Sequence, residues 1–300
     1  MDLSGVLIPA ATPFDGVSGD VDPVAFRENL RHWLQAPIRG IVVGGSTGEA
    51  VLLDREERGV LLEAARGVIP EDRLLVAGTG AESTRETLRL TRDAAERGAD
   101  AVLVQPPAYY RGQMTAQALR THYRRVADEA PVPVVLYQVP LRFSTVELET
   151  GLVAELSEHP NVVGIKDSRG DLNLVGELVT SARSDFQVLV GSGSAFYASL
   201  EVGAVGGILG VANLLPHEAC AIHAELGRGR SSEAGRVQEV VGPVHNRVVG
   251  ALGVPGVKAA LDLLGLRGGL PRPPLMPLNE RDREAVREAL TGASALPVEA

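Results

Sequence analysis

A lysine at the end of an apolar segment is the main candidate nucleophile in this sequence. Lys166 follows the apolar residues 162–165, and only Lys166 and Lys258 are lysines among the 29 cationic side chains. Since the chain otherwise uses arginine for positive charge, we interpret a lysine as kept for a role that arginine cannot fill, such as that of a neutral nucleophilic amine. A free lysine amine is almost wholly protonated at neutral pH, so Lys166 would depend on its apolar neighbours for desolvation. The presence of only two lysines could also be chance in an arginine-rich composition, and Lys166 could be an exposed surface lysine. Lys258 lies in a helical pattern and is not expected to react.

A glycine-rich segment with two hydroxyl groups follows another apolar run. Residues 40–43 lead into Gly44-Gly45-Ser46-Thr47-Gly48-Glu49. Glycines such as Gly45 let the backbone approach a ligand closely, and the hydroxyls and amides of Ser46 and Thr47 could hold a small carboxylate. Such a segment is also typical of a simple turn.

Tyrosines end one apolar run and follow another. Tyr137 closes residues 133–137, where its phenol could relay protons or merely cap the core with its hydroxyl in water. Tyr109 and Tyr110 lie in the segment after residues 101–104, which predicts either a functional loop or a packed interface.

All of these residues stand at the ends of short apolar segments, which we predict to be β-strands. Patterns with apolar residues three and four positions apart separate the segments and indicate helices. Eight strands that are apolar on both faces and alternate with helices favour a closed (β/α)8 barrel over an open doubly wound sheet. The active site of such a barrel lies at the carboxyl ends of its strands. The predicted strands are residues 5–8, 40–43, 74–77, 101–104, 133–137, 162–166, 187–190 and 206–209.

The remaining sequence predicts helices without further strands. We expect an α/β protein with one (β/α)8 TIM barrel and a C-terminal helical extension. Residues 1–215 would form the barrel core, and residues 216–300 the last barrel helix and an appended bundle. The helical stretches there are residues 216–226, 231–252, 254–264 and 279–290. Helix starts are indicated elsewhere by Asp54 three positions before Glu57 and by Ser83 three before Glu86.

Composition excludes several functional classes. The net charge of -9 argues against a surface that binds nucleic acid. No apolar run approaches the roughly 20 residues that cross a bilayer, and the first residues do not resemble a secretory signal, so we expect a cytoplasmic protein with no membrane partner. Cys220 is the single cysteine, which excludes an intrachain disulfide and a thiolate metal site, and we expect it to be buried.

The motifs together resemble one family. Gly45-Ser46-Thr47-Gly48-Glu49, Tyr137 with Val139-Pro140, and Gly164-Ile165-Lys166-Asp167 are similar, in order and spacing, to the dihydrodipicolinate synthase and N-acetylneuraminate lyase family of class I aldolases. The resemblance extends from residues 9–14 to residues 274–278, which is essentially the whole chain.

The resemblance implies an enzyme that acts on a small 2-oxo acid and an aldehyde. It implies that Lys166 forms an imine with pyruvate or another 2-oxo acid, that Tyr137 transfers protons, and that Ser46 links Tyr137 to Tyr110 in a proton relay. The tyrosine matching Tyr110 often comes from a neighbouring subunit, and a homodimer or homotetramer is implied. No metal or organic cofactor is implied, because the lysine itself supplies the electrophile. The implied substrate-binding residues are Gly45, Thr47, Arg142, Ser168, Gly191 and Ile208.

Local similarity favours one activity within the family without excluding others. Residues 108–112, 159–168 and 203–207 look most like 4-hydroxy-2-oxoglutarate aldolase, which yields pyruvate and glyoxylate. Those aldolases typically carry Asn at the position of Thr47. The Gly-Gly-Ser-Thr-Gly-Glu motif instead resembles the corresponding motif of sialic acid lyases. Arg142 matches the arginine with which dihydrodipicolinate synthases hold the carboxylate of aspartate semialdehyde, although Phe143 and Ser144 replace the usual Thr-Gly and Arg142 could equally be a solvated surface residue.

Three further hypotheses stay open. One is an aldolase or dehydratase of 2-keto-3-deoxy sugar acids on the same Schiff-base site. Another is a barrel without catalytic activity, which the combination of Lys166, Tyr137 and the two hydroxyls disfavours. The third is an isomerase that binds phosphate through Gly191-Ser192-Gly193-Ser194.

Overall fold

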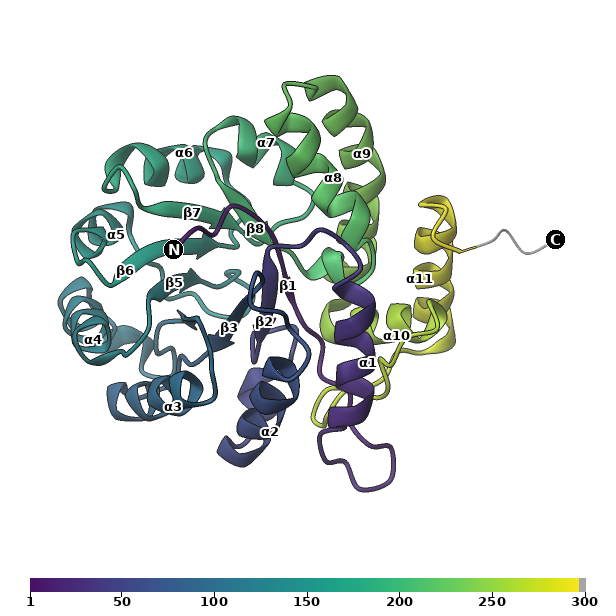
Figure 1. The fold of residues 1–300 in the computed structure, drawn as a ribbon, viewed down its shortest axis with the longest axis horizontal. Helices are drawn as coiled ribbons and strands as arrows, with labels where there is room; N and C mark the ends of the chain where they lie inside the picture. The colour runs from purple at the N-terminus through teal and green to yellow at the C-terminus, as the bar shows by residue number, and fades with distance from the viewer. Residues whose placement is uncertain (297–300) are drawn as a thin grey trace.

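Eight parallel strands form a closed barrel in sequence order, and a helix follows each strand (Figure 1). The structure is a computed structural model that describes residues 1–296. The strands are β1 Gly5–Pro9, β2 Gly40–Val43, β3 Leu74–Gly78, β4 Ala101–Val104, β5 Val134–Gln138, β6 Val162–Asp167, β7 Gln187–Val190 and β8 Gly206–Ile208. The barrel closes because β1 pairs with both β2 and β8. This confirms the predicted (β/α)8 barrel and excludes the open doubly wound sheet.

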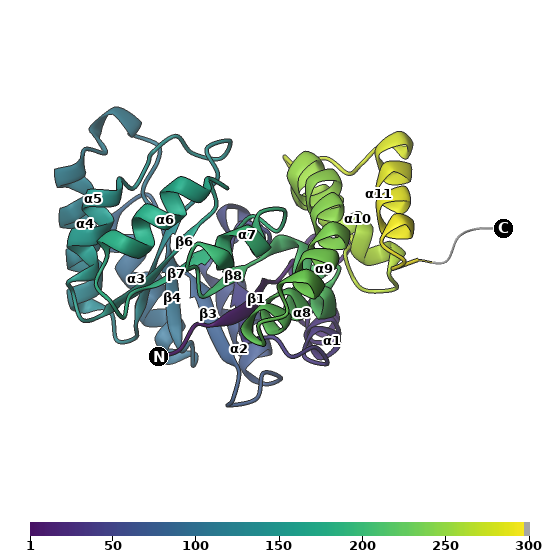
Figure 2. The ribbon, with the colours of Figure 1, turned by 90° about the horizontal axis from the view of Figure 1, so that it is seen from above.

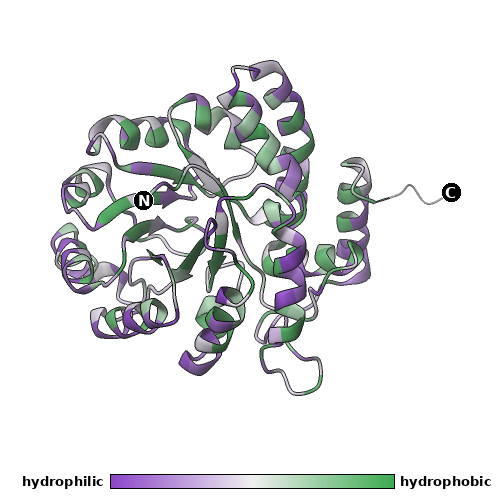
Figure 3. Cartoon of the chain, in the orientation of Figure 1, coloured by the Kyte–Doolittle hydropathy of each residue, from purple (hydrophilic) through white to green (hydrophobic). Residues whose placement is uncertain are grey.

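The helices that follow the strands cover the outside of the barrel. They are α1 Pro23–Trp33, α2 Arg55–Arg66, α3 Thr84–Glu96, α4 Ala116–Glu129, α5 Thr150–Ser157, α6 Leu172–Ser181, α7 Phe196–Glu201 and α8 Pro216–Gly227. The predicted starts of two of them are observed, since Asp54 and Glu57 form a capping box on α2 and the Ser83 side chain accepts from the Glu86 N–H on α3. Hydrophobic residues concentrate on the strands, and hydrophilic residues lie on the outer faces of the helices (Figure 3).

Alternate residues of each strand face two different cores. In β2 and β3, Val42 and Val76 point into the barrel interior, whereas Ile41 and Leu75 pack against the helices. Both cores are buried, which explains why the strands are mostly apolar on both faces. Leu3 lies in the interior core ahead of β1, where its N–H donates to Gln187 Oε1 at 2.7 Å.

The appended helices lie to one side of the barrel (Figure 2). They are α9 Ser231–Val244, a π-helical turn η4 at His245–Gly250, α10 Ala251–Leu263 and α11 Glu280–Gly292. The predicted break between residues 252 and 254 coincides with Gly253, which leaves the helical conformation at φ 62° and ψ -143°. The predicted division of the chain falls directly before α8, which contacts β1, and the division stays a prediction. Short 3-10 turns lie at η1 Ala50–Leu52, η2 Arg111–Gln113 and η3 Gly210–Asn213.

Candidate functional site

Lys166 and Tyr137 lie side by side on neighbouring strands of the barrel. The register of β5 and β6 pairs Tyr137 with Lys166. Ile165 and Leu136 belong to the outer core, so the alternation along each strand directs Lys166 and Tyr137 inward. The exposed fractions are 5% for Lys166 and 3% for Tyr137, and Lys166 Nζ lies 4.2 Å from the centroid of the phenol ring. A buried amine is thus held against a buried phenol.

The glycine-rich segment after β2 brings Ser46 and Thr47 to the same place. Ser46 Oγ lies 3.3 Å from the Tyr137 hydroxyl, at hydrogen-bond distance. Gly44 adopts φ 69°, which favours glycine and turns the chain away from the strand. Among residues 1–296 the amides of Ser46 and Thr47 donate to no backbone or side-chain acceptor. Two adjacent free amides with two hydroxyls form a suitable cradle for a carboxylate.

The environment of Tyr137 favours loss of its proton. Burial alone would raise the pKa of the phenol, but the charge of Lys166 and the hydrogen bond with Ser46 outweigh burial and lower the pKa below its ordinary value of 10. A phenol with a lowered pKa accepts and returns a proton more readily at neutral pH. Tyr137 is therefore chemically suited to proton transfer beside the amine.

Three further predicted residues surround Lys166. Ser168 lines the cavity beside Tyr137 and helps to lower the pKa of the phenol. A methyl group on Gly191 would lie 1.9 Å from Ser168 Oγ and 3.1 Å from Lys166 Cε, which shows that only glycine leaves room there. Ile208, 2% exposed, ends β8 in the interior core.

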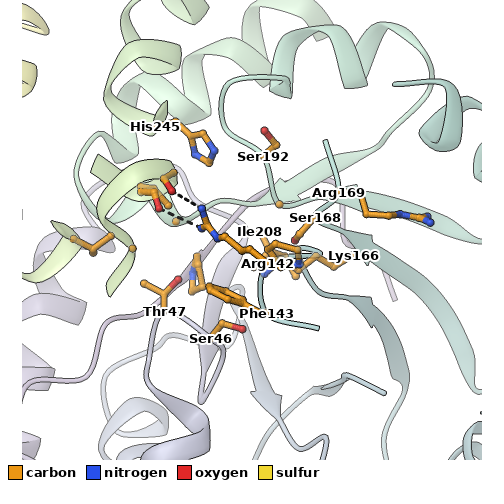
Figure 4. Close-up of a pocket in the computed structure, with 18 of the residues that line it drawn as sticks. Ser46, Thr47, Arg142, Phe143, Lys166, Ser168, Arg169, Ser192, Ile208 and His245 are labelled. Atoms are coloured by element: carbon orange, nitrogen blue, oxygen red, sulfur yellow. Dashed lines mark hydrogen bonds between the residues drawn. The ribbon is translucent and has the colours of Figure 1, made fainter. Parts of the chain in front are cut away.

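These residues line one cavity of about 400 Å3 at the carboxyl ends of the strands (Figure 4). The predicted residues that line it are Ser46, Thr47, Tyr137, Arg142, Lys166, Ser168, Gly191 and Ile208. Two predicted residues lie outside the lining, Gly45 and Tyr110. Tyr110 is 69% exposed and contacts only the ring of Tyr109, at 5.1 Å, among the described aromatic residues. Its role in a relay with Ser46 stays a prediction that requires a neighbouring subunit.

Arg142 lines the cavity and is nevertheless exposed to solvent. Its guanidinium donates to the carbonyl oxygens of Val249, at 3.3 Å, and Gly250 (Figure 4). It also lies 5.0 Å from the centroid of the Phe143 ring. The structure thus places this cation at the rim of the cavity, where the π-helical turn holds it.

Sequence reasoning missed His245, which also lines the cavity. Its Nδ1 accepts a hydrogen bond from the N–H of Gly193 at 3.2 Å. Burial, with a contribution from the charge of Arg142, lowers the pKa of His245 to about 4, so the ring is neutral at pH 7. His245 follows Gly193 by 52 residues in the chain, and nothing in its helical surroundings in the sequence distinguishes it from a surface residue. The same bond occupies an amide of the segment 191–194 that a phosphate-binding loop would leave free.

Lys258, the second lysine, is fully buried behind the glycine-rich segment. Its Nζ donates to Glu49 Oε1 and to Thr12 O, each at 2.8 Å, and lies 4.3 Å from the centroid of the Phe14 ring. Glu49 adopts φ 58° and accepts from the Arg272 N–H at 2.8 Å. The amine does not line the cavity, so Lys258 holds the segment that carries Ser46 rather than contacting a ligand.

Other site types receive no support from the described residues. Within residues 1–296, no three His, Cys, Asp or Glu side chains are grouped so that they could hold a metal ion. No helix in this part of the chain has the length and apolar character needed to cross a membrane. Cys220 is buried and unpaired, and burial raises the pKa of its thiol to about 12.

Comparison with known proteins identifies relatives along the whole chain. The Dihydrodipicolinate synthetase family matches residues 2–293. A probable mitochondrial 4-hydroxy-2-oxoglutarate aldolase of Emericella nidulans is 36% identical over 294 residues, which cover 96% of this chain and 94% of the relative. A 4-hydroxy-tetrahydrodipicolinate synthase of Xanthomonas axonopodis is 39% identical over 298 residues, which cover 99% of this chain and 96% of the relative. The crystal structure of a chloride-inhibited dihydrodipicolinate synthase of Acinetobacter baumannii, in complex with pyruvate, superposes with a TM-score of 0.93 at 31% identity and covers 98% of this chain and 100% of that one.

Proposed function

This chain belongs to the dihydrodipicolinate synthetase family, whose members are class I pyruvate-dependent lyases and aldolases, and from this premise we propose that it acts through a Schiff base on Lys166. One observation carries the assignment. Lys166 Nζ lies 4.2 Å from the ring centroid of a buried tyrosine whose hydroxyl is within reach of Ser46, at the base of an open cavity. A desolvated lysine beside a proton-transfer group is the arrangement that imine formation requires.

We propose the cleavage of 4-hydroxy-2-oxoglutarate to pyruvate and glyoxylate as the reaction. The Lys166 amine adds to C2 of the substrate, and Tyr137 gives a proton to the departing hydroxyl, so that water leaves and the imine forms. Tyr137 then accepts the proton of the C4 hydroxyl while the C3–C4 bond breaks. The electron pair of that bond moves into the imine to give an enamine, and glyoxylate leaves. Protonation at C3 and hydrolysis release pyruvate and restore the lysine.

Two parts of the cavity support a dicarboxylic substrate. Ser46 and Thr47 offer hydroxyls and free amides to the carboxylate next to the reacting carbon. Arg142 at the rim supplies a guanidinium, which binds a second carboxylate better than it binds sugar hydroxyls. The second candidate is the condensation of pyruvate with aspartate semialdehyde, which also brings a distal carboxylate and which the Xanthomonas relative favours.

We further propose a homodimer or homotetramer in which Tyr110 of one subunit completes the relay of another. Tyr109 and Tyr110 are 80% and 69% exposed on one loop, which is unusual for adjacent tyrosines and suits an interface. We propose that no metal or organic cofactor takes part, because the imine itself withdraws the electrons.

Borohydride reduction in the presence of pyruvate tests the proposal. We expect mass spectrometry to find one reduced pyruvate adduct in the wild-type protein, on Lys166 and not on Lys258. The Lys166→Arg variant should carry no adduct. The absence of any adduct on a folded protein would refute the Schiff base. Pyruvate release from 4-hydroxy-2-oxoglutarate, compared with consumption of aspartate semialdehyde, then decides between the two candidate reactions.

A further inference from the structure

The outer part of the cavity contains one side chain whose hydrogen-bonding role the backbone fixes. His245 Nδ1 accepts from the Gly193 N–H at 3.2 Å, so in the neutral ring the proton resides on Nε2. No acceptor for Nε2 is present among residues 1–296, although the side chain lines the cavity. His245 therefore offers the cavity a single directed N–H donor.

This donor lies nearer the mouth of the barrel than the reactive amine. Lys166 pairs with Leu189 within the strand ladder. Gly193, which holds the His245 ring, lies four residues beyond Leu189 and outside β7. Lys166 and His245 line the same cavity, so a substrate bonded to Lys166 occupies a space that the His245 ring borders.

The same π-helical turn also fixes the position of Arg142. The turn starts at His245, and its last two residues, Val249 and Gly250, accept hydrogen bonds from the guanidinium. Figure 4 shows the Arg142 guanidinium at the carbonyl oxygens of this turn, and both Arg142 and His245 line the cavity. Burial keeps the pKa of His245 near 4, so at neutral pH the ring adds no charge beside the arginine.

We propose that His245 is a specificity residue whose Nε2–H binds the distal carboxylate of the substrate beside Arg142. The inference rests on the function proposed above and adds a second donor to the recognition of dicarboxylic 2-oxo acids. A directed neutral donor suits a carboxylate oxygen that the arginine leaves unpaired, because hydrogen bonds to charged groups are the stronger ones.

A matched pair of acids and a matched pair of variants test this role. The acids are 2-oxoglutarate and 2-oxopentanoate, which have the same chain length and differ only in the distal carboxylate. His245→Asn keeps an acceptor for the Gly193 N–H but is too short to donate into the cavity. His245→Gln is long enough to place an amide N–H near the position of Nε2. The measurement is the acid concentration that gives half-maximal borohydride trapping on Lys166.

We expect the wild-type protein and His245→Gln to prefer 2-oxoglutarate, and His245→Asn to lose about tenfold of that preference, which is the effect of one hydrogen bond to a charged group. In His245→Asn, trapping of 2-oxopentanoate should change less than trapping of 2-oxoglutarate does. Equal preference in both variants and the wild type would overturn the inference, and so would an equal loss for both acids, which would mean that His245 only supports the loop.

Calorimetric binding of the two acids separates this inference from the Schiff-base proposal. If the wild type traps neither these acids nor pyruvate but binds 2-oxoglutarate more tightly than His245→Asn does, the Schiff base is refuted and the role of His245 is supported. If the wild type traps both acids and His245→Asn keeps the preference, the role of His245 is refuted alone. Failure to bind either acid would refute the role of His245, and the pyruvate adduct on Lys166 still decides the Schiff base.

Discussion

Replacement of the buried lysine behind the site should weaken both the fold and substrate binding. In Lys258→Met, Glu49 loses the ammonium 2.8 Å from its Oε1 while its own side chain stays 0% exposed. The remaining partner is the Arg272 N–H on Oε2, which leaves one carboxylate oxygen buried and unpaired. Breaking a buried pair from one side costs about 3–5 kcal/mol, a large share of the roughly 5–15 kcal/mol that stabilises a typical domain.

Urea unfolding followed by circular dichroism measures this cost, and a double-mutant cycle assigns it to the pair. We expect Glu49→Gln with Lys258→Met to be at least about 1 kcal/mol more stable than the sum of the two single losses predicts, because no charge is then left unpaired. A loss below about 1 kcal/mol in Lys258→Met, or additivity of the two substitutions within about 0.5 kcal/mol, would refute the reasoning.

The same pair also predicts an effect on binding. Glu49 stands three residues after Ser46, at φ 58°, so its anchor determines how the carboxylate-binding segment lies. In the folded Lys258→Met protein we expect the KM for 4-hydroxy-2-oxoglutarate to rise more than kcat falls. Lys258→Arg should not restore the wild-type values, because a planar guanidinium does not fit between Thr12 O, Glu49 and the Phe14 ring as a compact ammonium does.

Three further predictions follow from the site and its surroundings. Tyr137→Phe should retain the fold and lower kcat by about 10²–10⁴, measured as pyruvate release, because the proton-transfer group is lost. Gly191→Ala should slow borohydride trapping of pyruvate by about tenfold. Its methyl group would lie 3.1 Å from Lys166 Cε and would force Ser168 to move. Burial lowers the pKa values of His122 and His245 to about 4, below the ordinary 6.5, so the unfolded chain binds protons first as the pH falls. The free energy of unfolding should therefore decrease between about pH 6.5 and pH 4 by about 1.4 kcal/mol per pH unit for each histidine, and urea titrations of a variant with both replaced by Gln should show a smaller slope.

The barrel could be predicted because the residues within each strand show, without reference to the rest of the chain, that the strand is buried on both faces. Parallel strands buried on both faces are mostly apolar along their length, and the predicted bounds differ from those observed by at most one residue at either end. Lys166 and Tyr137 were predictable for the same reason. A polar residue that ends an apolar strand must lie at the mouth of the barrel.

Contacts between distant segments could not be predicted in this way. His245 lines the cavity because a π-helical turn far along the chain places it against Gly193. No local sequence pattern predicts such a turn. The contact of Arg142 with the carbonyl of Gly250 joins residues 108 positions apart, so the sequence left open whether this arginine faces water or the cavity. The predicted role of the exposed Tyr110 needs a second subunit, so the structure of one chain does not test it.

The two lysines of the chain occupy different structural environments. Both lysines are buried, at 5% and 0% exposure, whereas the chain's arginines provide its other cations. Lys166 lines the cavity, where an amine can become a nucleophile and a guanidinium cannot. Lys258 lies behind that cavity, where a compact ammonium fits between a carbonyl, a carboxylate and an aromatic ring. The two buried lysines thus occupy different places, Lys166 at the cavity and Lys258 behind it, and the composition alone did not distinguish them.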